Sequence, residues 1–124
     1  MFTLNPGLTV HLHREAIDFR KAINGLTALV EHELGSDPFA TAVYVFTNRR
    51  RDRIKLLGWH RNGFWLLHKR LESERFIWPR QDAQGPCGDA QVIDLTVQQL
   101  HWLLDGIDLQ AMRGHDVVHY KRAA

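Results

Sequence analysis

The feature that most constrains the fold of this chain is a pair of apolar segments joined by four residues. Segments 53–59 (RIKLLGW) and 64–70 (FWLLHKR) have the length and apolar content of β-strands, and the link between them reads HRNG. Asn-Gly readily takes the positive φ angles of tight turns, so the link predicts a β-hairpin. A link this short allows only antiparallel pairing. The fold is therefore expected to contain this two-stranded ribbon.

Three further strands are predicted around the hairpin. The segments are rich in β-branched and aromatic residues or alternate between apolar and polar ones, and they lie at 8–13, 41–46 and 74–79. Pro79 would stop the last of them. Residues 80–91 contain Gly and Pro without any apolar period, which indicates an irregular loop.

Two helices are predicted from the spacing of apolar residues. A long first helix is expected from Asp18, as its N-cap, to Gly35, because apolar residues recur there at three- and four-residue steps. A second helix is expected to begin after the N-cap Thr96 and to stop at Gly106.

These elements predict an α+β fold. We expect a small antiparallel sheet of four to five strands, built from hairpins and packed against one long N-terminal helix and a C-terminal helix. Residues 1–109 would form one domain and residues 110–124 a C-terminal tail. Because an antiparallel sheet can bury one face and expose the other, function is expected on the uncovered face.

Positive charge is concentrated in one part of the chain. The formal net charge is only +2, but residues 47–80 carry ten lysines and arginines against three acids, or +7, and the remainder carries −5. A phosphate-bearing partner or an acidic protein would explain this segregation. The densest part is the link TNRRRD, where only Asp52 offsets Arg49, Arg50 and Arg51. Arginine forks match phosphate oxygens bidentately, which favours a functional role for these three.

Strand alternation predicts which side chains share a face beyond this link. The odd-numbered residues from Arg53 to Trp59 point one way, and an even-length turn places the even-numbered residues from Phe64 to Arg70 beside them. Cations interleaved with aromatic rings suit nucleic acid, although Trp59 and Phe64, taken alone, are better explained as core residues. The candidate nucleic-acid-binding residues are Arg49, Arg50, Arg51, Arg53, Lys55, Arg61, His68, Lys69, Arg70 and Arg75.

No catalytic, metal or cofactor site is predicted. The sequence has no Gly-rich phosphate loop, no cysteine pairs at zinc spacing and no nucleophile elbow. His11 with His13, and His115 with His119, have spacings that would bring two histidines together, but two ligands without a third are a weak signal for zinc.

Nothing in the sequence predicts export or contact with a membrane. The N-terminus MFTLNPG lacks the charged and then apolar pattern of a signal peptide, and no apolar run approaches the length that spans a bilayer. The single cysteine, Cys87, cannot form an internal disulfide. A cytoplasmic protein is therefore expected.

Three blocks of the sequence carry a resemblance to a known family. They read DFRKAINGLTALVEHELGSDPF, VYVFTNRRRDRIKLLGWHRNGFWLLHKRLESERFIWP and LTVQQLHWLLDGIDL. In order and spacing they resemble the small accessory protein of IS66-type bacterial insertion sequences, the second-reading-frame protein also called TnpB. That protein is not the RNA-guided nuclease of the same name. The resemblance runs from about Leu4 to Leu109, and its middle block is the most specific.

The resemblance implies a role in transposition. The family protein is encoded beside a large DDE-type transposase and assists it without being the catalyst. The implied partners are transposon DNA, the transposase of the element and its other accessory proteins. The sequence departs from the family at His60, where Asp usually follows the tryptophan, and its C-terminal tail is longer than expected.

Two functions stay open from the sequence. In the first, the protein is a DNA-binding accessory factor whose arginines hold transposon DNA through its phosphates. In the second, it is a non-catalytic adaptor whose basic face docks an acidic surface of the transposase or of another accessory protein. Salt-dependent binding to free DNA distinguishes the first from the second.

Overall fold

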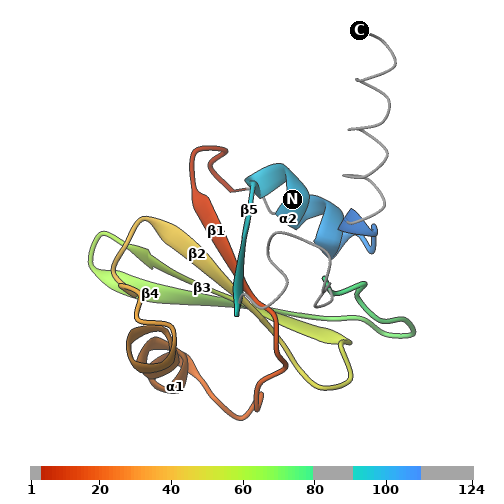
Figure 1. Cartoon of the computed structure of the whole chain (residues 1–124), viewed down its shortest axis with the longest axis horizontal. Helices are drawn as coiled ribbons and strands as arrows, with labels where there is room; N and C mark the ends of the chain where they lie inside the picture. Colours follow the sequence, from red (N-terminus) through yellow and green to blue (C-terminus); the bar gives the residue numbers. More distant parts are fainter. Residues whose placement is uncertain (1–3, 80–90, 110–124) are drawn as a thin grey trace, which may run out of the picture.

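The computed structural model describes residues 4–79 and 91–109, which form a twisted sheet with helical segments on both faces (Figure 1). In chain order the elements are β1 (Thr9–His13), α1 (Ile23–Ala28), the π-helical turn η1 (Leu29–Glu33), β2 (Ala42–Thr47), β3 (Arg53–His60), β4 (Gly63–Arg70), β5 (Val92–Leu95) and α2 (Val97–Leu104). The predicted tail at 110–124, Cys87, and the pair His115 and His119 lie outside the described residues. The predicted α+β class is confirmed.

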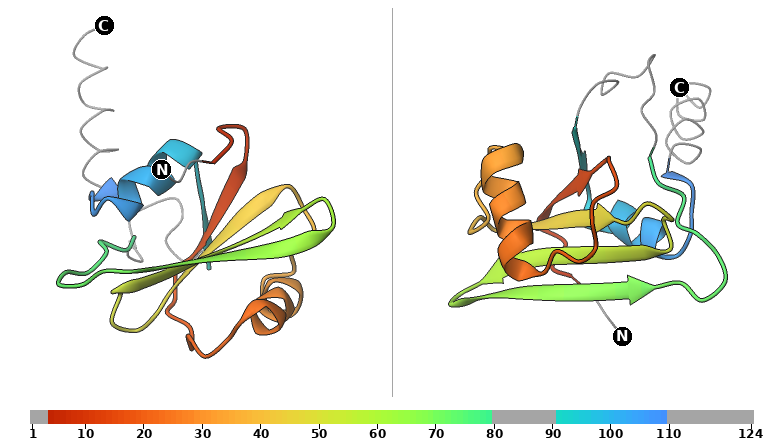
Figure 2. Two further views of the ribbon diagram at one scale, coloured as in Figure 1. Left: turned by 180° about the vertical axis from the view of Figure 1, so that it is seen from behind. Right: turned by 90° about the horizontal axis from the view of Figure 1, so that it is seen from below.

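The sheet is mixed, so the prediction of an entirely antiparallel sheet is wrong. Its strand order is β4-β3-β2-β1-β5, and β1 pairs with β2 in parallel while the other neighbours are antiparallel. Parallel neighbours need a long crossover, and the segment that contains α1 provides it between His13 and Ala42. Figure 2 shows this segment leaving the sheet and returning to it.

Both faces of the sheet are covered, so the prediction of one exposed, functional face is also wrong. On one face α1 and η1 pack Leu26 and Val30 against residues of β2 and β3 that include Tyr44 and Leu57. On the other face α2 packs against apolar residues of β1, β2 and β3. In Figure 1 the two helices lie on opposite sides of the sheet. The surfaces left for a partner are therefore the loops and the sheet edges.

The first helix is shorter than predicted because its expected start is engaged elsewhere. Together α1 and η1 span 11 residues, from Ile23 to Glu33, and the N-cap is Ala22 rather than Asp18. The Asp18 carboxylate instead accepts bonds from the backbone N of Arg20 (2.9 Å) and from its guanidinium (2.6 Å). These bonds lower the pKa of Asp18 to about 2.

A lysine of the sheet also opposes helix formation before residue 22. The Lys55 ammonium donates to the backbone carbonyls of Phe19 (2.8 Å) and Lys21 (2.7 Å), which a helix would use for its own amides. The C-terminal end matches the prediction, since Gly35 follows η1 with a φ of +61°.

The last strand lies later in the chain than predicted. Residues 74–79 form no strand, and two aromatic residues there serve as anchors: the backbone N of Phe76 donates to the Arg51 carbonyl (2.7 Å), and Nε1 of Trp78 donates to the His13 carbonyl (3.2 Å). Both side chains are buried. The pairing position beside β1 is taken by β5.

The second helix begins and ends as predicted. The Thr96 hydroxyl accepts a bond from the backbone N of Gln99, whose side chain bonds back to the backbone N of Thr96. This capping box satisfies two amides that the first helical turn leaves free. Gly106 follows the helix with a φ of +87°.

The hairpin has the predicted register but a different turn geometry. Trp59 pairs with Phe64 and Arg53 pairs with Arg70, so the predicted faces are confirmed. The positive φ falls on Arg61 (+56°) and not on Asn62 or Gly63, because the backbone N of Asn62 bonds to the His60 carbonyl (2.6 Å) across a single residue. Arg61 therefore takes the conformation that was expected of Asn-Gly.

One glycine of β3 is required by the ring that covers it. A Cβ added at Gly58 would lie 2.3 Å from the Trp65 indole, whereas one added at Gly63 would meet nothing within 4 Å. We expect Gly58→Ala to lower the free energy of unfolding by about 1–3 kcal/mol, because a rigid indole has to move. Gly63→Ala, the control, should change it by less than about 0.5 kcal/mol. Urea denaturation measures both, and equal effects would contradict this packing.

Candidate nucleic-acid interface

The arginine loop, residues 48–52 between β2 and β3, is held in shape by the Asn48 side chain. Asn48 Oδ1 accepts from the backbone N of Arg53 (3.1 Å), and Asn48 Nδ2 donates to Asp52 Oδ1 (2.7 Å). The backbone N of Arg51 bonds to the Asn48 carbonyl (3.0 Å), and Arg51 takes a left-handed φ of +60°. The loop is thus a closed turn and not an open link.

A second chain segment supports this loop from the side. The backbone N of Leu71 bonds to the Asp52 carbonyl (2.8 Å), and the backbone N of Phe76 bonds to the Arg51 carbonyl (2.7 Å). These bonds bring the segment after β4 against the arginine loop. Exposed Arg75, next to Phe76, therefore joins the same end of the molecule.

Cations face one another across β3 and β4 beside the loop. Arg53 lies opposite Arg70, and Lys55 lies opposite His68. Like charges directly opposite each other in a sheet repel and cost stability. Burial lowers the pKa of His68, and the charges of Lys55, Arg53 and Arg70 lower it further. This end of the sheet therefore has a positive potential that favours an anion.

The loop arginines are available to a partner. Arg49 and Arg50 are exposed and Arg51 is half-buried, and within residues 4–79 and 91–109 no acid forms an ion pair with any of the three. The Asn48 hydrogen bond lowers the pKa of Asp52, against the effect of burial, and the charges of Arg53 and Arg50 lower it further. Asp52 thus stays ionised but is occupied with closing the turn.

Two further arginines of the basic strands differ in how they are held. The Arg70 guanidinium forms an ion pair with the Glu72 carboxylate at 3.2 Å, and both side chains are largely exposed. Arg53 is half-buried, and its buried Nε atom has no hydrogen-bond partner. An exposed pair of this kind adds little stability, so Arg70 can exchange its carboxylate for a phosphate at little cost.

Three of the ten candidate residues are not brought to this site. Lys55 is only 6% exposed, and its ammonium holds the segment before α1. Burial lowers its pKa, and the Arg53 charge lowers it further against the opposite effect of Asp18. Lys69 points to the other face and donates to the Leu104 carbonyl of α2 (2.9 Å). Arg61 lies in the turn at the far end of the hairpin.

The histidine pair of β1 has structural partners. His11 Nδ1 lies 2.7 Å from Asp94 Oδ1, and the ring stacks on Tyr44. His13 is buried against Phe46 and bonds through Nδ1 to a backbone carbonyl. Among the described residues, no three His, Cys, Asp or Glu side chains gather as a metal site would require.

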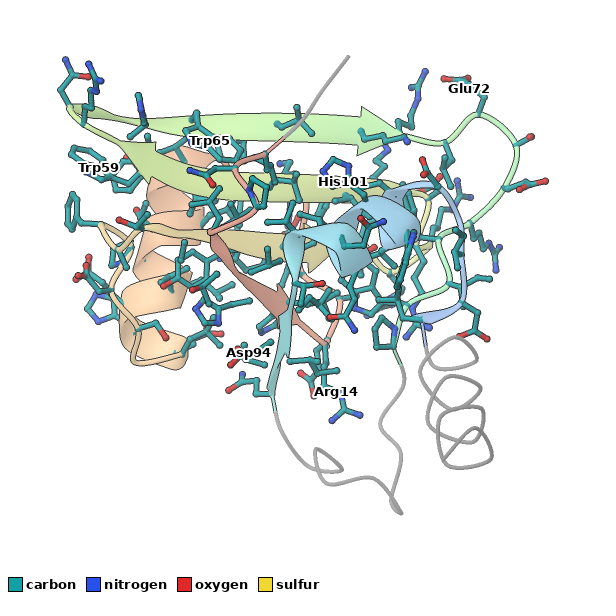
Figure 3. All side chains as sticks on the ribbon, turned by 90° about the horizontal axis from the view of Figure 1, so that it is seen from above. Arg14, Trp59, Trp65, Glu72, Asp94 and His101 are labelled. Carbon is teal, nitrogen blue, oxygen red and sulfur yellow. The ribbon has the colours of Figure 1, made fainter. Side chains whose placement is uncertain are left out.

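An aromatic cluster at the opposite end of the hairpin was only partly predicted. Phe39, from the loop before β2, lies 5.0 Å from Trp59 and 5.2 Å from Phe64 between ring centroids, and those two rings are 4.9 Å apart. Trp59 and Phe64 are half-buried, whereas Phe39 is 53% exposed. Figure 3 shows Trp59 and Glu72 at opposite ends of the β3–β4 hairpin. Phe39 was missed because its segment has only the signal of a turn.

Comparison with known proteins assigns the family. A family model described as IS66 Orf2 like protein matches residues 8–114, including the arginine loop, the hairpin and both helices. The chain belongs to the IS66 Orf2-like family. The resemblance drawn from the sequence blocks is thereby confirmed, and IS66 Orf2-like proteins are accessory proteins of insertion sequences.

Two relatives come from Sinorhizobium fredii. The protein y4jC is 33% identical to this IS66 Orf2-like chain over 102 residues, which cover 82% of this chain and 81% of the relative. The protein y4hO is 32% identical over 91 residues, or 73% of each. No solved structure matches the chain significantly. In the part of the chain that the structure describes, no helix has the length and apolar character needed to cross a membrane.

The different roles of the cations can be tested by removing one charge at a time. We expect Lys55→Met to lower the free energy of unfolding by about 1–3 kcal/mol, because two backbone carbonyls lose their donor and the segment before α1 loses its attachment to β3. Arg50→Met removes the same charge from an exposed site and should change it by less than about 0.5 kcal/mol. Urea denaturation of both variants is the measurement, and a stable Lys55→Met protein would refute the role given to this lysine.

Proposed function

We propose that this IS66 Orf2-like protein assists the transposase of its insertion sequence by binding DNA, without being a catalyst itself. The contact surface consists of the arginine loop and the adjoining ends of β3 and β4. Its residues are Arg49, Arg50, Arg51, Arg53, His68, Arg70 and Arg75. Lys55, Lys69 and Arg61 are left out because the first two donate to backbone carbonyls and the third lies at the far end of the hairpin.

The observation that carries this proposal is the pairing of like charges across the strands. Arg53 opposite Arg70 costs stability in the free protein, and three loop arginines add to the same potential. A row of phosphates would relieve that repulsion and release counter-ions from the DNA. The loop is also already closed by Asn48, so little conformational entropy is lost when it binds.

The first experiment replaces Arg49, Arg50 and Arg51 together with alanine. We expect weaker binding to any duplex. The slope of log K against log salt should also become shallower by up to about 3 units, since each phosphate contact contributes nearly one unit to that slope. Fluorescence anisotropy over a salt series measures both. Arg61→Ala, which removes an exposed arginine at the other end of the hairpin, is the control and should leave the slope unchanged. Unaltered binding by the triple variant would rule out the arginine loop as the contact.

The second experiment follows the protonation of His68. In the free protein its pKa should lie below the ordinary 6.5, because burial and three neighbouring cations disfavour the charged ring. Bound phosphates offset those cations, so the pKa should rise on binding, and binding should strengthen as pH falls through that range. NMR titration of the imidazole with and without duplex DNA measures the shift. The same pKa in both states would place the DNA elsewhere.

A second candidate function is favoured by the aromatic cluster. Partly exposed aromatic side chains are frequent anchors of protein interfaces, and Phe39, Trp59 and Phe64 lie at the end of the hairpin away from the arginine loop. An adaptor that docks the transposase or another accessory protein could use them. A pull-down of the transposase with and without nuclease treatment distinguishes the two functions. Capture that survives nuclease favours the adaptor, and capture that nuclease abolishes favours the DNA-binding factor.

A further inference from the structure

The strand β4 forms a long free edge of the sheet. It has eight residues and stands last in the order β4-β3-β2-β1-β5, whereas the other edge strand, β5, has four. Figure 3 shows no other described element beside its outer side. Natural edges are usually blunted by shortness, proline or bulges. Here β4 contains no proline, its ladder to β3 is unbroken, and its one lysine turns to the Leu104 carbonyl.

The register identifies the backbone groups that face outward. His60 and Gly63 close the two-residue turn as a hydrogen-bonded pair, and such pairs alternate along an antiparallel ladder. Residues 65, 67 and 69 therefore bond to β3, while residues 64, 66, 68 and 70 present their N–H and C=O groups to the free edge. Within residues 4–79 and 91–109, no backbone hydrogen bond joins these outward groups to another segment.

A shallow hollow lies next to β4 on each face of the sheet. On the α1 side a shallow hollow is lined by residues 20–25 and Leu66. On the α2 side another is lined by residues 67–70, His101, Leu104 and Asp105. Side chains of an added strand alternate between faces, so each hollow would receive alternate side chains of that strand.

We propose that a second copy of this chain pairs with the first, antiparallel, along β4. The register that uses the full strand places Phe64 opposite the partner's Arg70, Leu66 opposite the partner's His68, and Leu67 opposite the partner's Leu67 on the twofold axis. It forms about eight hydrogen bonds between the copies. Each cation then meets a ring or an apolar side chain of the partner, and Arg70 over Phe64 is an attractive cation–π arrangement.

The charges of β4 select a second copy in this orientation. The basic side chains, His68, Lys69 and Arg70, all lie at one end of the strand, and the aromatic residues lie at the other. Antiparallel pairing separates the positive ends of the two β4 strands, whereas parallel pairing would place Arg70 beside the partner's Arg70. It also brings the turn that carries Arg61 towards the partner's Glu72, which is 80% exposed. This arrangement rests on the strand register and not on the proposed binding of DNA.

The first test removes one outward donor. His68→Pro deletes an N–H that β3 does not use, so the hairpin ladder stays intact while two bonds of the symmetric interface are lost. Sedimentation equilibrium of the full chain should show a dimer whose dissociation constant rises at least about tenfold in the variant. His68→Ala keeps the N–H and should dimerise nearly as the parent does. A parent that is monomeric at every concentration, or a folded proline variant that dimerises as tightly, overturns the proposal.

The second test fixes the register and does not depend on the proline variant. In a Cys87→Ser background, Leu67→Cys should form a disulfide between copies under mild oxidation. The proposed pair across the axis has its Cα atoms about 4.5 Å apart, within disulfide range. Asp94→Cys, an exposed position on the other edge strand, controls for random collision. Failure of Leu67→Cys to cross-link, or equally fast linking by Asp94→Cys, overturns the proposed pairing.

Discussion

The register between β3 and β4 is the constraint on which the rest of this structure depends. It places Gly58 under the Trp65 indole, aligns the rings of Trp59 and Phe64, and sets Arg53 opposite Arg70. A shift by one residue would exchange the two faces of β4 and move the cations towards α2. The β3–β4 hairpin, which carries the charge, thus also contributes side chains to the hydrophobic clusters on both faces of the sheet.

The local elements of the fold were predictable, whereas the long-range ones were not. The hairpin, its faces and the second helix follow from residue spacing, from the N-cap Thr96 and from the stop at Gly106. The start of the first helix does not, because it depends on Lys55, which lies more than thirty positions further along the chain. The parallel pairing of β1 with β2 and the position of β5 also depend on contacts that no local pattern records.

The candidate site shows the same division. Spacing alone brings Arg53, His68 and Arg70 to one face, as predicted. Residue spacing cannot distinguish a cation that is available to a partner from one that already bonds within the protein, because Lys55 and Lys69 have the same chemistry as a phosphate-binding lysine. Their ammonium groups instead satisfy backbone carbonyls around the ends of α1 and α2. Arginine, with a delocalised and weakly hydrated charge, is left to form the outer surface.

The opposed cations of β3 and β4 also determine how this protein responds to its ionic surroundings. In the unbound protein, dissolved ions screen Arg53 from Arg70, so a rise in ionic strength weakens the repulsion between them. The same ions compete for the phosphates of a nucleic acid and weaken its complex. Electrolyte therefore weakens both the repulsion within the free protein and the attraction to nucleic acid that we propose.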